Sequence, residues 1–475
     1  MGHYLAVDLG AESGRVMLGS LEGGRLALEE LHRFANTAVH LPTGLYWNSF
    51  RLFHDIVHGL GVAGRAPDLK VTGIGIDTWG VDFGLLASDG SLIDCPRHYR
   101  DARTNGMMDK LFECVPRGEV FNYTGIQFMQ LNSLYQLYAM KLAGSPGLAA
   151  ADQLLFMPDL LSYWLTGVRK SEMTIASTSQ FYDPRTRSFC NEMLDRLGLP
   201  TRILPPLVEP GTLLGALREE IAAATHLGPA PVYATAAHDT ASAVAAVPAA
   251  TDTTWCYISS GTWSLMGLEL KAPLINERSL EANFTNEIGA EGTVRFLKNI
   301  AGMWLLQECR RAWADEGIEY TYDVMTRLAD EAGPAEALID VDAFLHPGDM
   351  PNKIAAWLRE GGLPAPKKPG AMCRMILESL AARYKQVLET LESLSGRRIE
   401  VVHIVGGGSR NRLLNQLVAN ATGRTVVAGP AEATAMGNVL VQAIAAGELK
   451  NLAEGREVVR RSCELETFVP AAAHA

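Results

Sequence analysis

The chain has 475 residues, of which 48% are hydrophobic and 20% are charged, so it is neither disordered nor fibrous. It carries 42 lysines and arginines against 53 aspartates and glutamates, a net charge of −11 at pH 7. Such a chain has no overall basic field to attract phosphate backbones. We therefore expect neither nucleic acid nor an anionic membrane as a partner, whereas a small phosphate ligand needs only a local pocket.

The length predicts about two to four domains. The first residues lack the basic start and the apolar run of a secretion signal. The longest stretch of mainly small and apolar residues, 234–250, is interrupted by His238, Asp239 and Pro248 and cannot be a membrane span. The seven cysteines are scattered, without a CxxC motif. We expect no zinc site, no disulfide framework and a cytoplasmic protein.

The chain opens with a strand, a turn and a second strand. Residues 4–9 are an apolar run typical of a buried strand, 10–14 form a small-residue turn, and 15–19 are apolar again. A dinucleotide-binding fold or a P-loop would place a helix after the glycines, and neither motif is present.

The same plan returns in the second half. A polar, turn-rich stretch after Pro248 predicts a domain boundary, and 255–258, 259–262 and 263–267 again read as strand, turn and strand. The two segments agree in pattern more than in identity. We therefore expect two similarly built domains, 1–247 and 248–475.

Periodicity and turn residues predict the other elements. We expect strands at 71–78, 231–236 and 399–405, and helices at 136–151, 159–164, 241–247, 376–391 and 411–422.

Three small-residue turns, 10–14, 259–262 and 406–409, each follow a predicted strand. Successive free N–H groups in such turns can bind an anion, and the third turn is also expected to open a helix. Taken alone, each turn fits ordinary turn chemistry better than a binding site, because such short motifs often occur by chance. Together they indicate a nucleotide held between two lobes.

Two aspartates follow buried strands. Asp8 could bind Mg²⁺ next to phosphates, or cap the turn that it precedes. Asp239 could be a rigidly held general base for a sugar hydroxyl, or the N-cap of the helix that follows; the two roles can coexist.

Two polar clusters, 77–82 and 97–104, could form a sugar pocket. The alternatives are core packing for Trp79 and a solvated surface for the second cluster. Asn299 and Gln307 are polar positions that could reach a ligand.

Several segments resemble the FGGY family of carbohydrate kinases. The resemblance runs in order from about residue 4 to 463 and is carried by 8–15, 75–83, 238–243, 259–264 and 406–409. Further stretches are similar to the members that act on L-rhamnulose, namely 99–104, 124–128, 157–159, 283–287 and 297–300.

The resemblance implies an α/β fold with two actin-like, ribonuclease H-like domains flanking a deep catalytic cleft. The sugar is expected on 1–247 and ATP on 248–475. The implied reaction is phosphorylation of L-rhamnulose at O1 by Mg²⁺-ATP, giving L-rhamnulose 1-phosphate and ADP in L-rhamnose breakdown. The alternatives are a kinase for L-fuculose or xylulose, a non-catalytic sugar sensor on the same fold, and an actin-like ATPase chaperone.

The resemblance also assigns roles to residues. Asp239 is the implied base, and Asp8 is the implied carboxylate for Mg²⁺, acting through water. The implied sugar-binding residues are Gly80, His238, Asp239, Thr240 and Asn299. The implied ATP-binding residues are Ala11, Glu12, Ser13, Gly14, Arg15, Thr262, Gln307 and Gly407. Two positions depart from the family pattern: Glu12 stands where serine is commoner, and Ile288 stands where glycine is usual.

Overall fold

The computed structural model describes residues 2–250 and 252–471. The chain divides into two compact units. Unit 1 comprises Met1–Ala246, Glu269–Phe296 and Ala433–Ser462, and unit 2 comprises Val247–Leu268, Leu297–Glu432 and Cys463–Ala475. Unit 1 therefore contains two segments from later in the chain, beyond the contiguous range 1–247 expected from the sequence. The expected assignment of sugar and ATP to the two sides stays a prediction.

Unit 1 contains a six-stranded sheet in the order β13-β14-β6-β1-β2-β3. β1 pairs with β2 in the antiparallel and with β6 in the parallel direction, and β6 is parallel to β14. The strands are β1 (Gly2–Leu9), β2 (Ser13–Glu22), β3 (Arg25–Ala35), β6 (Gly73–Thr78), β13 (Thr212–Ala216) and β14 (Pro231–Ala234).

The two faces of β6 differ because alternate side chains point to opposite sides of a sheet. Ile74 and Ile76 lie in the hydrophobic core together with residues of α1 (Ser49–Gly64). Gly73 and Gly75 face α17 (Ala433–Ala445), since a Cβ on Gly73 would lie 2.6 Å from Oε1 of Gln442. Glycine on this face therefore lets α17 lie close against the sheet, and Asp77 points to the same side.

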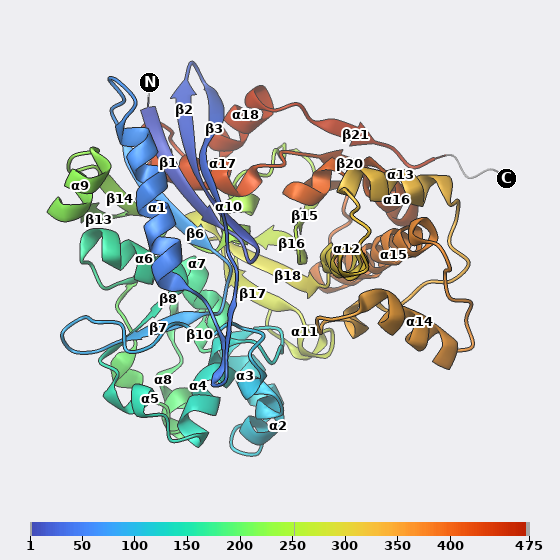
Figure 1. Ribbon diagram of the computed structural model, residues 1–475, viewed down its shortest axis with the longest axis horizontal. Coiled ribbons are helices and arrows are strands. Elements are labelled where there is room, and N and C mark those ends of the chain that lie inside the picture. Colours follow the sequence, from blue (N-terminus) through green and yellow to red (C-terminus); the bar gives the residue numbers. More distant parts are fainter. Residues whose placement is uncertain (1, 251, 472–475) are drawn as a thin grey trace. The chain divides into compact units, whose positions relative to one another are not determined.

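α17 also packs against α10 (Asp239–Ala245), and their backbones touch (Figure 1). A Cβ on Gly437 would lie 1.7 Å from the carbonyl oxygen of Ser242. Because α10 begins at Asp239, the position of the predicted base depends on this helix–helix contact.

Much of the segment 83–207 has a hydrophobic core of its own, apart from the core under the six-stranded sheet. The predicted helix 136–151 is wrong as a single element: α4 (Ser133–Leu142) ends before Gly144, and α5 (Pro146–Ala150) follows. Gly144 has a φ of +60°, a left-handed conformation that ends the first helix, and Ser145 caps the second one. The remaining elements of unit 1 are β4 (Val39–Leu41), β5 (Gly44–Tyr46), β7 (Phe83–Leu86), α2 (Met107–Phe112), α3 (Arg117–Thr124), β8 (Gln153–Phe156), α6 (Met157–Thr166), β9 (Ser171–Glu172), α7 (Met173–Ala176), β10 (Tyr182–Asp183), β11 (Ser188–Phe189), α8 (Asn191–Arg196), β12 (Leu207–Val208), α9 (Glu219–Thr225), α11 (Glu277–Glu281) and α18 (Leu452–Ser462).

A second sheet has the order β17-β18-β16-β15-β19-β20-β21. β15 is antiparallel to β16 and parallel to β19, which is parallel to β20. The order β18-β16-β15-β19-β20 repeats β3-β2-β1-β6-β14 of unit 1, which confirms the similarity of plan expected from the sequence. The strands are β15 (Trp255–Ser260), β16 (Ser264–Leu270), β17 (Thr285–Ile288), β18 (Val294–Ile300), β19 (Val401–Val405), β20 (Thr425–Ala428) and β21 (Glu466–Phe468).

The longest helix of unit 2, α15 (Pro369–Ser395), extends beyond the predicted 376–391, and Gly396, with a φ of +68°, caps its C-terminus. The hydroxyl groups of Tyr384 on α15 and Ser264 on β16 lie 2.6 Å apart. None of the helices in the described ranges has the length and apolar character of a membrane span. The other helices are α12 (Trp304–Asp315), α13 (Tyr322–Glu331), α14 (Met350–Glu360) and α16 (Arg412–Thr422).

Replacing Gly437 by alanine should destabilise unit 1, because the added methyl group would overlap the backbone of α10. We expect a loss of about 1–3 kcal/mol in the free energy of unfolding, measured by urea denaturation. The matched control is Gly455→Ala in α18, where the nearest atoms belong to the side chain of Leu440 at 3.4 Å. The control should be neutral or stabilising by up to about 1 kcal/mol. Equal effects of the two substitutions would contradict the close contact between α10 and α17.

Candidate active site

Three aspartates lie at one edge of the unit 1 sheet. Asp8 and Asp77 are register partners at the carboxyl ends of the parallel strands β1 and β6. β14 leads to His238 and Asp239, and the amide of Thr78 donates to the carbonyl of Ala237 at 2.9 Å. The carboxyl ends of parallel strands meet at one edge, where α/β proteins place their ligands. The sequence pointed to Asp8 and Asp239 but did not single out Asp77.

Asp8 is balanced by Arg15, one of the residues predicted to bind ATP. The two face each other across the antiparallel pair β1–β2, and Nε and Nη2 of Arg15 lie 3.1 and 2.8 Å from Oδ2 of Asp8. The guanidinium therefore compensates the charge of a nearly buried carboxylate.

Asp77 is completely buried. Its Oδ2 accepts a hydrogen bond of 2.6 Å from Nδ2 of Asn438 on α17, and Oδ1 of Asn438 accepts one from Gln442. Burial raises the pKa of Asp77 well above its usual value, and the charges of Asp8 and Asp239 raise it further. Asp77 therefore holds its proton at a higher pH than an exposed aspartate does.

Asp239 is the most accessible of the three carboxylates, with 30% of its side chain exposed. Its Oδ1 accepts hydrogen bonds from the amide and the hydroxyl group of Thr240 and lies 3.3 Å from Nε2 of His238. Burial raises the pKa of Asp239, whereas His238 opposes this rise. The alternative prediction of a helix N-cap is wrong, because His238 occupies the cap position and Asp239 is the first residue of α10.

Buried groups hold the segment before Asp239. The amide of Ala237 donates to Oε2 of Glu172 at 3.0 Å, and the amide of His238 donates to Oγ1 of Thr174 at 3.1 Å. The ring of His238 is buried, and its Nδ1 faces Glu287 and Arg295. Sequence reasoning missed these four partners, which come from distant segments of the chain and share no motif with residues 238–243.

The first predicted sugar cluster is partly structural. Asp82 is buried and accepts hydrogen bonds from the indole groups of Trp47 and Trp79, at 2.5 and 2.9 Å. Core packing, the alternative for Trp79, is therefore what the structure shows. Beside it, Val81 has a φ of +70°, unusual for a β-branched residue, and its amide is held by Thr178 at 3.0 Å. A strained backbone thus adjoins Gly80, the predicted sugar-binding residue.

The second predicted cluster is not a solvated surface. Asp101 is buried, accepts a hydrogen bond of 2.7 Å from the amide of Leu45 and caps the short 3₁₀ helix Ala102–Thr104. Arg103 donates to Gln136 at 2.7 Å. Gln136 in turn donates to Asp82 at 2.9 Å, so the second cluster contributes to the surroundings of Asp82.

In unit 2, the turn after β15 and the glycines after β19 lie together. A Cβ on Gly408 would lie 2.0 Å from Oγ of Ser260, so the glycine backbone lies directly against that residue. α12 starts on the same turn, where the amide of Trp304 donates to the carbonyl of Thr262 at 3.1 Å. Thr262, Gln307 and Gly407 therefore belong to one region, and Oε1 of Gln307 is buried without a hydrogen-bond partner among the described residues.

One expectation for this region is wrong. The turn 406–409 does not open an α-helix: Gly407–Arg410 form a 3₁₀ turn, and α16 begins only at Arg412, capped by Asn411. Any anion bound here would meet the amides of the 3₁₀ turn and not the N-terminus of α16.

The other predicted residues are placed as follows. The residues Ala11, Glu12, Ser13, Gly14 and Arg15 form the turn between β1 and β2 and the start of β2, in unit 1. Glu12 is exposed, whereas Ile288 is buried in β17. Asn299 lies on β18 in unit 2, while Gly80, His238, Asp239 and Thr240 lie in unit 1.

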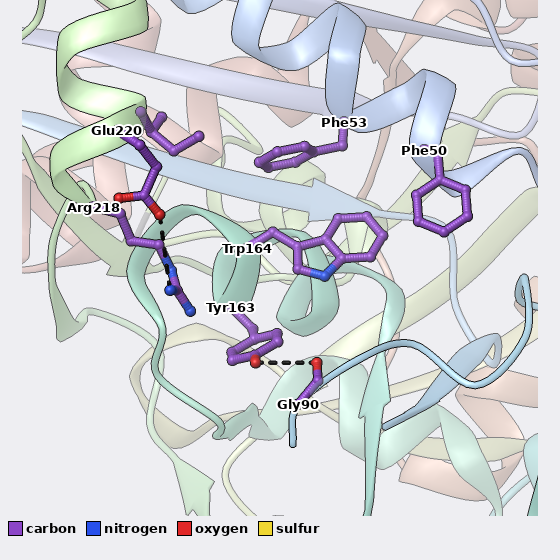
Figure 2. Close-up of a pocket in the computed structure, with 8 residues that line it drawn as sticks. Phe50, Phe53, Gly90, Tyr163, Trp164, Arg218 and Glu220 are labelled. Carbon is purple, nitrogen blue, oxygen red and sulfur yellow. Dashed lines mark hydrogen bonds and ion pairs between the residues drawn. The ribbon is translucent and has the colours of Figure 1, made fainter. Parts of the chain in front are cut away.

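A surface cavity of about 390 Å³ lies elsewhere in unit 1 (Figure 2). Its walls include Phe50 and Trp164, whose rings are stacked 5.8 Å apart, and Tyr163, which donates to the carbonyl of Gly90 at 3.2 Å. No predicted site residue lines it, so the candidate site rests on the sheet edges and not on this cavity.

Mg²⁺ could reach few protein ligands here. Within residues 2–250 and 252–471, no three His, Cys, Asp or Glu side chains are grouped as a metal site. A single carboxylate is still enough for Mg²⁺, which keeps several waters and binds through one or two carboxylates together with substrate phosphates. Asp8 fits that role.

The fold and these sites define the class of protein. Solved structures with the same fold include a xylulose kinase from Lactobacillus acidophilus, 14% identical, with a TM-score of 0.80 over 99% of this chain and 94% of that one. A glycerol kinase from Plasmodium falciparum with ADP is 13% identical, with a TM-score of 0.77 over 99% and 94%. The predicted α/β class with two actin-like, ribonuclease H-like domains is confirmed.

The chain belongs to the FGGY family of carbohydrate kinases: the N-terminal domain of the family matches residues 3–246 and the C-terminal domain matches residues 256–446. Curated relatives include a rhamnulokinase from Bacteroides thetaiotaomicron, 48% identical over 98% of this chain and 96% of that protein. Another, from Bacillus subtilis, is 39% identical over 98% and 95%. The protein is an ATP-dependent carbohydrate kinase.

Gly407→Ala tests whether a nucleotide approaches the glycine turn. A Cβ at Gly407 meets no atom within 4 Å, so the free energy of unfolding should change by no more than about 0.5 kcal/mol. If ATP lies against this backbone, the methyl group should weaken ATP binding about tenfold or more, as measured by calorimetry. Gly408→Ala, which would overlap Ser260, should lower stability as well. An unchanged ATP affinity in Gly407→Ala would remove Gly407 from the ATP site.

Proposed function

We propose that this kinase transfers the γ-phosphoryl group of ATP to the O1 hydroxyl of L-rhamnulose, with Asp239 as the general base. The chemistry rests on one observation: among three clustered aspartates, Asp239 is the accessible one, while Asp8 is paired with Arg15 and Asp77 is buried. The choice of sugar is supported by the rhamnulokinases that are 37–48% identical over nearly the whole chain.

Asp239 is suited to accept a proton. A general base needs a fixed carboxylate that a substrate hydroxyl can reach. The start of α10 and the hydrogen bonds from Thr240 fix the side chain, and its exposed third remains open to a ligand. In this proposal Gly80, His238, Thr240 and Asn299 bind the sugar.

The phosphates require compensation of charge. Phosphoryl transfer passes through a loose transition state, so positioning and electrostatic stabilisation supply most of the catalysis. The proposed ATP site uses the amides of 11–15 with the side chain of Arg15, and Thr262, Gln307 and Gly407 of unit 2. Asp8 would hold Mg²⁺ through water; when bound, the ion would neutralise charge on the phosphates.

The setting of the reaction is also part of the proposal. All seven cysteines lie in the described part of the chain, and no disulfide joins any two of them, which is compatible with a reducing compartment. We therefore place the kinase in the cytoplasm and its product in L-rhamnose breakdown.

Asp239→Asn should fold and bind ATP but lose turnover by about three or more orders of magnitude, because the amide cannot accept the proton of O1. The measurement is sugar-dependent ADP release in a coupled assay, with ATP affinity and thermal unfolding as checks. The matched control is Asp323→Asn, an exposed aspartate in the first turn of α13, which should keep full activity. Near-wild-type turnover of Asp239→Asn would exclude Asp239 as the base.

The dependence of kcat/KM on pH should also reveal Asp239 as the base. Burial raises the pKa of Asp239 above its usual 3.8, so the base takes up its proton at a higher pH than an exposed aspartate. We expect kcat/KM to fall as the pH drops through that raised pKa, while ellipticity shows that the protein remains folded. The residual activity of Asp239→Asn should lack this acidic limb. A limb that persists unchanged in the variant would assign it to another group.

A panel of ketoses tests the substrate. L-Rhamnulose, L-fuculose and xylulose are compared by kcat/KM in the ADP assay, and we expect L-rhamnulose to exceed the others at least tenfold. A higher value for another ketose would overturn the choice of sugar. Sugar binding without ADP release would indicate a sensor, and ADP release without sugar would indicate an ATPase.

A further inference from the structure

A fully buried ion pair lies behind the proposed base. Arg295 has no exposed surface, and Glu287 has 5% of its side chain exposed. Nη2 of Arg295 lies 3.1 Å from Oε2 of Glu287, and Nε of Arg295 donates to the carbonyl of Ile288 at 3.1 Å. Burial by itself would raise the pKa of Glu287, but Arg295 and His238 keep it below its usual value. The pair is therefore charged.

Stability alone gives little reason for such a pair. Removing two charges from water costs several kcal/mol for each ion, and apolar replacements of similar volume are often neutral or stabilising. A buried pair of this kind that also contacts a site residue points to a role beyond folding.

The contact is with His238. Its Nδ1 lies 3.1 Å from Nη2 of Arg295 and 3.3 Å from Oε2 of Glu287, and its Nε2 lies 3.3 Å from Oδ1 of Asp239. The four side chains thus form one continuous series that ends at the proposed base. All four belong to unit 1.

The possible protonation states of the ring lead to one orientation. If Nδ1 accepts a hydrogen bond from Arg295, the neutral ring carries its proton on Nε2. If Nδ1 instead donates to Glu287, Nε2 faces Oδ1 of Asp239 favourably only when it carries a proton as well. A neutral ring with a bare Nε2 would turn a lone pair toward the carboxylate of Asp239. Both favourable states therefore donate from Nε2 to Asp239.

We propose that Glu287 and Arg295 are positioning residues, which hold His238 so that its Nε2–H donates to Oδ1 of Asp239 and orients that carboxylate for the sugar hydroxyl. This inference rests on the proposed function of Asp239. Neither residue needs to touch a ligand; their effect passes through the imidazole ring.

The test replaces the pair by groups of similar size, Glu287→Gln together with Arg295→Met. We expect kcat to fall about 10- to 100-fold, the range for loss of an outer-shell partner at other sites. The KM for ATP should stay within twofold of the wild-type value. A pair that served only to stabilise the fold would change the unfolding temperature and leave kcat of the folded enzyme intact.

The matched control is Glu392→Gln with Arg424→Met in unit 2. That pair has the same pattern, since Nε of Arg424 donates to the carbonyl of Ile399 and Nη2 lies 3.0 Å from Glu392. Its removal should leave kcat within twofold of the wild-type value. Equal losses of kcat in both double variants, or none in the Glu287 and Arg295 variant, would overturn the proposal.

A spectroscopic measurement keeps the test independent of turnover. In protein labelled with ¹⁵N-histidine, with the His238 signals identified by their loss in His238→Gln, we expect proton coupling at Nε2 in the wild type. In the Glu287 and Arg295 double variant a population with the proton on Nδ1 alone should appear. A wild-type ring protonated only on Nδ1 would overturn the proposal.

The assays use the ketose that the wild type phosphorylates fastest. If that ketose is not L-rhamnulose, the choice of substrate fails while the comparison of variants still decides the role of the pair. If Asp239→Asn is active, the base assignment fails; the ring measurement then still reports whether the pair fixes His238.

Discussion

The parallel pairing of β1 with β6 brings the carboxyl groups of Asp8 and Asp77 to adjacent positions in a nearly water-free setting. Two buried negative charges on adjacent strands repel each other strongly. The structure resolves the repulsion by giving the two groups different partners. Arg15 balances the charge of Asp8, whereas burial and the charge of Asp8 raise the pKa of Asp77, and the hydrogen bond from Asn438 opposes that rise. Asp239 then remains the accessible carboxylate of the group.

The duplicated sheet order is used differently in the two units. Both place a tight turn after one strand, β1 or β15. Both also place polar or small residues after the parallel neighbour of that strand, β6 or β19. In unit 1 this edge carries acids, and in unit 2 it carries glycines and hydroxyl groups around Ser260. Acids can take part in proton transfer, whereas bare backbone can approach phosphates closely. One architecture thus carries chemically different groups at the strand ends of its two sheets.

The sequence predicted the parts of this arrangement that depend on local signals. The strand–turn–strand units and the strand leading to Asp239 follow from apolar runs bounded by glycine, and the helix 376–391 from its period. The division of 136–151 was missed because Gly144 and Pro146 lie within an otherwise helical pattern. Asp77 was included only as a member of the polar cluster 77–82. The partners Glu172, Glu287 and Arg295 could not be predicted, because pairings between distant segments leave no local pattern.

The close contact between α17 and the strands of unit 1 also affects how the protein is made. α17 lies some 200 residues after α10 in the chain, yet it covers the face of β1 and β6 that carries Asp8 and Asp77. A ribosome releases the N-terminal segments long before this helix emerges. Until then, a glycine-lined face with two carboxyl groups stays uncovered. Contacts of such long sequence separation form slowly, so the edge of unit 1 that carries the three aspartates is completed only near the end of synthesis.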